Sequence, residues 1–328
     1  MPKWKYLILI LFALGILLSG FTIAELLSFR ESTERIVRVN NGDSARTIGT
    51  KLQKAGIINS ATAFRTLTKL RKADKDLKPG TYIFGGRTNL WQTVSKLKDG
   101  SSQNIRITFP EGLSLHKTLQ RIEASRLADY QSLYAAATDT STVRKLTGLK
   151  LASLEGFLYP ETYLFPISSS PDSILSIMSQ EFFRRLRRQK IVIEDSEAFY
   201  RSLILASIVE KEAGRAEERE IIAGVFRNRM RLAMPLQSCP TVDYVLEKRG
   251  IRREVLRNAD TSIPSPYNTY MNQGLPPTPI CNPRIESIVA ALNPAKHSYL
   301  YFFSNRQGQN VFSKNYEEHQ RLQRSLKL

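Results

Sequence analysis

Glu212 is the residue whose type and position first suggest chemistry, because it closes an apolar helical face within segment 202–214. Leu205, Ile208 and Val209 precede it at helical spacing, and a helix turns by about 100° per residue, so all four share one face. A carboxylate at the edge of a buried face is costly to ionise, and its pKa should rise towards values at which it can donate a proton. The pattern predicts a general acid. The alternative is a frayed helix end, since a glycine and a solvent-facing segment follow.

Glu210 is the other acid of this helix. It points about 160° away from Glu212 around the helix axis. We therefore place Glu210 with Lys211 on the wetter side.

Carboxylates, amides and tyrosines elsewhere form a set that is typical of a polysaccharide cleft, because sugars offer hydroxyls to hydrogen-bond and C–H faces to stack. Each has a structural alternative, since tyrosines also fill cores and a glutamate can cap a turn. The candidates are Glu155, Glu161, Gln237, Asp243, Tyr267, Asn268 and Tyr270.

Metal, nucleotide and serine-hydrolase motifs are missing from the sequence: HExxH, P-loop, GxGxxG and GxSxG do not occur. The three histidines, His116, His297 and His319, are scattered along the chain. We expect no metal site and no cofactor.

The amino terminus predicts a membrane anchor. Segment 6–24 has nineteen residues without a charge, enough for a helix that crosses a bilayer. Lys3 and Lys5 precede it, which places residues 1–5 in the cytoplasm, the anchor at 6–28 and the rest outside. A cleaved signal peptide is the alternative, although the run is long for one and has no clear A-x-A site.

The charge balance indicates an anionic neighbour. The chain of 328 residues carries a net charge of +18, which suits nucleic acid, lipid headgroups or an acidic wall polymer. Export argues against nucleic acid, so we expect none.

Two parts follow the anchor. Residues 29–102 comprise a charged stalk and a small βααβ module, and residues 103–328 a mixed α+β domain with long loops, in which 103–150 is a candidate second subdomain. The fold class is therefore α+β. Strands are expected at 36–39 and 298–303, and segment 77–84 is expected to be a turn followed by a strand. The expected helices are 45–54, 63–70, 88–100, 171–190, 217–232 and 285–292, and the loop-rich segments are 235–244 and 263–283.

Seven segments occur in an order that resembles the endolytic murein transglycosylase (MltG, YceG-like) family. They are LEGFLYPETY, ASIVEKEAG, GVFRNRM, MPLQSCPTV, SPYNTY, GLPPTPICNP and HSYLYFF. The resemblance implies a single-pass inner-membrane protein with a LysM-like module that binds glycans containing N-acetylglucosamine. It also implies cleavage inside peptidoglycan strands, with peptidoglycan synthases and division proteins as candidate partners.

By this resemblance Glu212 matches the family's catalytic glutamate, while Glu155, Gln237, Tyr267 and Asn268 line the cleft. One glutamate would then suffice: it protonates the bond between N-acetylmuramic acid and N-acetylglucosamine, and the muramoyl C6 hydroxyl closes a 1,6-anhydro ring. The alternatives are a hydrolytic muramidase that uses a second carboxylate, and a non-catalytic wall-binding division scaffold.

The two cysteines depart from the family pattern. Cys239 stands where the family commonly has Asp, and Cys281 where it commonly has a small residue. The resemblance puts both in loops beside the site, and an oxidising compartment favours pairing. We expect a disulfide between Cys239 and Cys281, and the alternative is a pair of buried free thiols.

Overall fold

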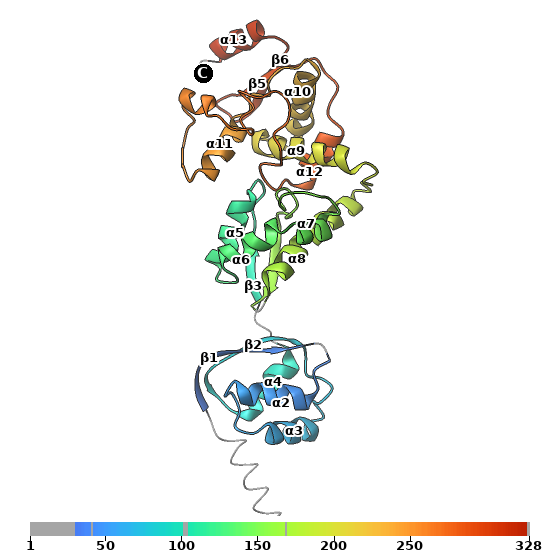
Figure 1. Cartoon of the computed structure of the whole chain (residues 1–328), viewed down its shortest axis with the longest axis vertical. Helices are drawn as coiled ribbons and strands as arrows, with labels where there is room; N and C mark the ends of the chain where they lie inside the picture. The colour runs from blue at the N-terminus through green and yellow to red at the C-terminus, as the bar shows by residue number, and fades with distance from the viewer. Residues whose placement is uncertain (1–29, 41, 101–103, 168, 327–328) are drawn as a thin grey trace, which may run out of the picture. The chain divides into compact units, whose positions relative to one another are not determined.

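The computed structural model describes residues 30–326 apart from 41, 101–103 and 168. The described residues form a mixed α+β fold with three two-stranded sheets (Figure 1). The chain divides into two compact units. The first holds the described residues up to 105 together with 164–167, and the second holds 106–163 and 169–326.

The predicted anchor at 6–28 lies outside the described residues. Among those that are described, none of the helices combines the length and the apolar composition that a membrane span requires.

The first unit has the predicted order of strand, two helices and strand, followed by a third helix. Strands β1 and β2 pair antiparallel, with Ile36 opposite Ile83. Serine or asparagine side chains cap the three helices, as Ser44 shows by accepting a hydrogen bond from the Thr47 amide. The elements are β1 (Arg30–Val39), α2 (Ala45–Lys54), α3 (Ala61–Leu70), β2 (Gly80–Thr88) and α4 (Leu90–Asp99).

The core of the first unit lies between this sheet and the helices. Residues on one face of each element are buried, as the helical and alternating patterns predict. They include Val37, Ile48, Leu52, Phe64, Tyr82, Phe84, Val94 and Leu97.

The second unit is mainly helical. Strands β3 and β4 pair with each other, and β5 pairs antiparallel with β6. The elements from residue 104 onward are β3 (Asn104–Thr108), α5 (Leu115–Ala124), α6 (Tyr130–Thr138), α7 (Thr140–Thr147), β4 (Thr162–Pro166), α8 (Pro171–Arg188), α9 (Ser196–Glu212), η1 (Ala216–Glu218), α10 (Arg219–Arg231), α11 (Cys239–Lys248), η2 (Asn258–Ser262), α12 (Ile285–Leu292), β5 (Tyr301–Ser304), β6 (Asn310–Ser313) and α13 (Tyr316–Ser325).

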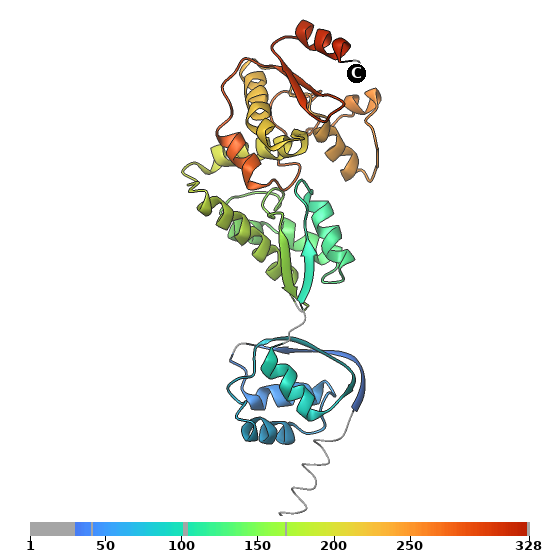
Figure 2. The same ribbon diagram turned by 180° about the vertical axis from the view of Figure 1, so that it is seen from behind.

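Helix α9 is the centre of the second unit. It packs against α10, α11 and α12, and both views of the ribbon show these helices around it (Figures 1 and 2). Every residue from 203 to 209 is buried. Because α9 is covered on several sides, its carboxyl-terminal end has a fixed position among its neighbours.

The expected loop at 235–244 is wrong in part, because α11 begins inside it at Cys239. Pro240 stands in the first turn of α11, where its missing amide hydrogen costs nothing. Helices α6, α7 and α13 and strand β6 had no clear sequence signal. The expected helices at 171–190, 217–232 and 285–292 are confirmed as α8, α10 and α12.

Candidate active site

Glu212 is the last residue of α9 and is half-buried. The Ser238 hydroxyl donates a hydrogen bond to its Oε1 at 2.6 Å. Among the described residues, no cation forms an ion pair with Glu212. The Nδ2 of Asn310, at the start of β6, donates to the Glu212 carbonyl oxygen at 3.5 Å, so both backbone and side chain are held.

The environment raises the pKa of Glu212 to about 7, first because burial disfavours the charged form. The hydrogen bond from Ser238 acts in the opposite direction, and the negative charge of Asp243 raises the pKa further. A carboxyl group with a pKa near neutrality can donate a proton and then accept one. The environment of Glu212 is thus consistent with the general acid that its place on the helical face predicts.

Glu210 is not on a wet face, and that expectation is wrong. Its side chain is 4% exposed and forms an ion pair with Arg284, whose Nε donates to Oε1 at 3.0 Å. The Arg284 amide and the Ser287 hydroxyl donate to Oε2 at 3.0 and 2.7 Å. The two oxygens of Glu210 are therefore occupied in joining α12 to α9, whereas Glu212 has a single side-chain donor among the described residues.

A cavity of about 1200 Å³ lies beside the end of α9. Its residues come from the start of α5, the end of α9, α11 and the segment that follows α11. They include Ser114, His116, Lys117, Gln120, Lys211, Cys239, Asp243, Tyr244, Glu247 and residues 250–256. Lys211 and Cys239 are the sequence neighbours of Glu212 and Ser238, so the cavity adjoins the candidate acid.

Glu247 joins the two long walls of this cavity. The Ser114 hydroxyl, at the start of α5, donates to Glu247 on α11, and Lys117 forms an ion pair with it at 2.8 Å. These contacts fix α5 against α11.

Glu155 lies beneath the same two walls and is 4% exposed. The Leu115 amide donates to one of its carboxyl oxygens at 2.8 Å and the Tyr244 hydroxyl to the other at 2.9 Å. Burial raises the pKa of Glu155 to about 8. The residue predicted to line the cleft therefore joins α5 to α11 from inside.

Gln237 precedes Ser238 and has a left-handed backbone, with φ of 50°. This region is unfavourable for a residue with a side chain, and such strain persists only where neighbours impose it. Here the Gln237 amide donates to the Thr269 carbonyl at 3.0 Å, and Arg229 donates to the Gln237 side chain at 3.1 Å. The turn at Gln237 leads directly into Ser238.

Tyr267 and Asn268 belong to a long loop that packs beside α11. The rings of Tyr267 and Tyr244 lie 5.0 Å apart, and the Tyr267 hydroxyl contacts Thr278 at 2.9 Å. Asn268 is fully buried, and its amide group bonds to the backbone of Thr261, Ile263 and Tyr270. Asn268 thus holds the loop in shape, while Tyr267 packs against the cavity wall.

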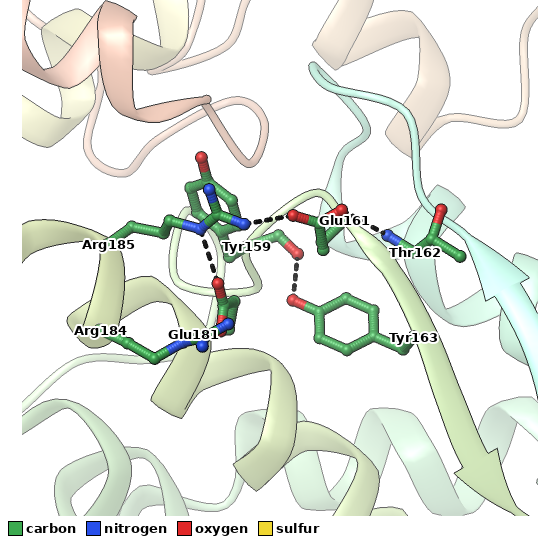
Figure 3. A network of polar contacts seen from close by, with 7 residues as sticks. All are labelled: Tyr159, Glu161, Thr162, Tyr163, Glu181, Arg184 and Arg185. Carbon is green, nitrogen blue, oxygen red and sulfur yellow. Dashed lines mark hydrogen bonds and ion pairs between the residues drawn. The ribbon is translucent and has the colours of Figure 1, made fainter. Parts of the chain in front are cut away.

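Glu161 belongs to a different cluster, which Figure 3 shows. Arg185 of α8 forms ion pairs with Glu161 and, at 2.6 Å, with Glu181, and Arg184 contacts Glu181 as well. Tyr163 donates to the Tyr159 carbonyl at 2.7 Å beside them. This network fixes α8 beside the start of β4.

The predicted disulfide does not form, and both thiols are free. Cys281 is buried and donates to the Ser207 carbonyl of α9 at 3.2 Å, whereas Cys239 is exposed at the start of α11 and contacts the Tyr270 hydroxyl at 3.0 Å. The two sulfurs therefore occupy separate environments, one against α9 and one at the cavity.

Metal ligands do not gather in the described part of the chain, where no three His, Cys, Asp or Glu residues could hold an ion together.

A family model described as the YceG-like family matches residues 37–325. The chain belongs to the YceG-like family. The resemblance seen in the sequence motifs is thereby confirmed.

Two curated relatives and one solved structure are similar to this chain. A Bacillus subtilis (strain 168) protein named endolytic murein transglycosylase is 30% identical over 93% of this chain and 88% of its own length. A Streptococcus pneumoniae (strain D39) protein of that name is 28% identical over 92% of this chain, and the match covers 60% of the Streptococcus protein. A crystal structure of a YceG-like protein from Listeria monocytogenes is 33% identical, with a TM-score of 0.57 over 88% of this chain and 98% of that one.

Two residues of this YceG-like chain that the sequence did not single out hold the site together. Ser238 bonds to Glu212, and Arg229 donates to the carbonyls of Pro235 and Leu236, both at 3.0 Å. A usable signal existed for Ser238, because serine is a common N-cap residue and Pro240 is compatible with the first turn of the helix that follows. Arg229 had no such signal, since its partners lie in a loop of irregular shape.

Proposed function

We propose that this chain is a membrane-anchored endolytic murein transglycosylase in which Glu212 acts as acid and then as base. The observation that carries the proposal is a carboxyl group with a pKa of about 7, placed beside a cavity of about 1200 Å³ and without a cation partner among the described residues. Family membership and relatives that bear this name support an enzyme that acts on peptidoglycan.

The proposed reaction transfers one proton out and one back. Glu212 protonates the oxygen that joins N-acetylmuramic acid to N-acetylglucosamine, and the bond from that oxygen to the muramoyl C1 breaks. The muramoyl C6 hydroxyl forms a new bond to C1 and gives its proton to the Glu212 carboxylate. The products are a 1,6-anhydro end and a strand with a free hydroxyl, and no water is consumed. The internal nucleophile has a high effective concentration, so no second carboxylate is required.

A hydrolytic muramidase is the second candidate. It would need a second carboxylate beside Glu212, since such enzymes use two. Glu161 is paired with Arg185, and Glu155 is buried beneath the cavity. Asp243, which lines the cavity and acts electrostatically on Glu212, is the remaining candidate for that role among the three weighed.

The deciding experiment is mass spectrometry of fragments released from purified glycan strands by the full-length chain and by its Glu212→Gln variant. Anhydro ends that disappear in the variant are expected. Glu217→Gln is the matched control, because Glu217 is an exposed glutamate a short distance along the chain. Reducing ends would show a muramidase instead, and intact strands with the wild type would leave a wall-binding scaffold.

The first unit is proposed to bind glycans in the manner of a LysM module, and residues 6–28 to anchor the chain with both units outside the cytoplasm. Trp91, 49% exposed with the Arg71 guanidinium 3.9 Å from its ring centre, offers a face for a sugar. Protease added to intact spheroplasts should digest both units, and Trp91→Ala should weaken retention of the full chain on cell-wall sacculi.

A further inference from the structure

Three aromatic rings of α5 and α6 form a continuous row, which we call the tyrosine row: Tyr134, Tyr130 and His116. The Tyr134 and Tyr130 rings are stacked at 16° with centres 5.8 Å apart. Tyr130 meets His116 edge to face with centres 5.3 Å apart. Tyr134 is 46% exposed, so the outer end of the row presents a ring to solvent.

The inner end of the row reaches the cavity beside Glu212. His116 and Gln120 both line that cavity, and the Gln120 side chain bonds to His116 at 2.9 Å. The other ring nitrogen of His116 bonds to the Tyr130 hydroxyl at 2.7 Å. Aromatic faces, an imidazole and a carboxamide thus follow one another from the surface into the cavity.

The row is held rigid before any ligand arrives. Tyr130 and Tyr134 are one helical turn apart on α6, where side chains naturally stack, and the hydrogen bond to His116 fixes Tyr130 from α5. A pre-ordered ring loses little conformational freedom on binding, which favours affinity.

We propose that the tyrosine row and Gln120 form a saccharide subsite that extends the cavity away from Glu212 and carries a sugar ring remote from the cut. The C–H face of a pyranose packs on an exposed aromatic ring, and its hydroxyl and acetamido groups hydrogen-bond to amide and imidazole groups. The inference rests on the proposed function, because it takes the ligand to be the same glycan strand.

The tyrosine row is chosen over a second exposed tyrosine because the row includes a residue that lines the cavity. Tyr316 of α13 is 57% exposed and stacks on His319 at 24°, with Tyr301 nearby. None of these residues is among those that line the cavity. Tyr316 therefore has the same chemistry without the continuity, and it is the matched control.

The first measurement is nitration of tyrosines with tetranitromethane, read peptide by peptide by mass spectrometry. The full-length Glu212→Gln variant is treated with and without purified glycan strands stripped of stem peptides. Strands should slow the nitration of Tyr134 and leave that of Tyr316 unchanged. Because the readout is local, binding of the strand by the first unit does not obscure it.

The second measurement is the kinetics of strand cleavage by Tyr134→Ala, Tyr134→Phe and Tyr316→Ala in the otherwise unchanged chain. A stacking contact of ordinary strength corresponds to a KM raised about three- to tenfold in Tyr134→Ala, with kcat little changed. Tyr134→Phe keeps the ring and should resemble the wild type, as should Tyr316→Ala.

Equal nitration of Tyr134 with and without strands, or an unchanged KM in Tyr134→Ala while anhydro ends still form, would overturn the subsite and leave the proposed function intact. If the wild type releases no anhydro ends but strands still protect Tyr134, the proposed function fails and the subsite is supported as a binding surface.

Discussion

The Ser238 hydroxyl donates to the Glu212 carboxyl at 2.6 Å although Ser238 is also the N-cap residue of α11. A serine at this position normally accepts a bond from an amide of the first helical turn, and the loss of such a cap costs about 1 kcal/mol. Here no side-chain cap bond forms. The start of α11 thus gives up a stabilising contact, and the hydroxyl faces the candidate acid.

The pH dependence of cleavage should follow the protonation of Glu212. A general acid must carry its proton, so kcat/KM should fall as the pH rises through about 7, the pKa of this carboxyl. Initial rates on purified strands between about pH 5 and pH 9 measure this. A rate that stays constant across neutral pH would exclude Glu212 as the acid.

Two neighbours should move this pKa in opposite directions. Ser238→Ala removes a bond that lowers the pKa of Glu212, so the fall in rate should shift to higher pH. Asp243→Asn removes a negative charge that raises the pKa, so the fall should shift to lower pH. The same pH series on both variants checks the pair, and shifts of equal sign would contradict the arrangement.

Substitutions of Glu210 and Glu212, at the carboxyl-terminal end of α9, should have different effects. Glu212→Gln should reduce cleavage by at least about a hundredfold with little change in unfolding, because it removes a proton donor. Glu210→Gln should lower the free energy of unfolding by about 2 kcal/mol, because it breaks a buried carboxylate's contacts with Arg284 and Ser287. Urea unfolding and strand cleavage of both variants separate the two roles. If Glu210→Gln lost cleavage and Glu212→Gln lost stability instead, the acid would be Glu210.

The sequence pattern predicted correctly those features that depend on the spacing of residues within one helix. Leu205, Ile208 and Val209 mark a buried face that Glu212 closes, and spacing along one helix reveals this. Helical spacing misplaced Glu210 because it assumes one dry and one wet face, whereas α12 and α10 cover α9 on further sides. Ser238 approaches Glu212 across 26 positions of sequence, and no local periodicity encodes that approach.

Glu155 should make stability depend on pH. Its pKa is raised to about 8 in the folded chain, well above that of an exposed glutamate, so the folded state binds this proton more tightly. Its contribution is fully present below the unfolded-state pKa and is lost as the pH rises towards about 8. A difference of one pKa unit between the folded and unfolded states is worth about 1.4 kcal/mol, so this proton contributes on the order of a few kcal/mol.

Glu155→Gln removes this titration, so between about pH 5 and pH 9 it should lose less stability than the wild type. Urea unfolding at several pH values measures the difference between the two proteins. Glu212 titrates in both of them, so its contribution to the pH dependence cancels in the comparison. Parallel curves for the two proteins would contradict the buried position of the proton.

Asn282 should be essential for stability. It is 2% exposed, accepts hydrogen bonds from the Gly156 and Leu158 amides at 3.0 Å each, and donates to the Leu113 carbonyl at 3.1 Å. Asn282→Ala leaves the buried Gly156 and Leu158 amides without this acceptor, although the backbone amide of residue 282 still donates to the Leu113 carbonyl, and should cost about 2–5 kcal/mol. Asn293→Ala, at an exposed asparagine, is the control for urea unfolding, and equal losses in the two variants would contradict the prediction.

The thiols should differ in accessibility. Cys239 is exposed and Cys281 is buried, so a maleimide reagent should label one site in the native chain and a second only after unfolding. Burial raises the pKa of both thiols, which makes the native reaction slow at neutral pH. Mass spectrometry of the labelled chain, with Cys239→Ser as control, checks this. If neither thiol reacted with maleimide until a reductant was added, the result would contradict this prediction and support a disulfide.

The bonds of Asn282 also constrain when the second unit can fold. They join this residue to Gly156, 126 positions earlier, and to Leu113, 169 positions earlier. Contacts between distant positions form slowly, and a ribosome synthesises the chain from its amino terminus. The segments around Leu113 and Gly156 therefore cannot form these bonds until residue 282 has been synthesised. Limited proteolysis should therefore digest nascent chains arrested before residue 282 within 106–163 and spare the same segment in the finished protein.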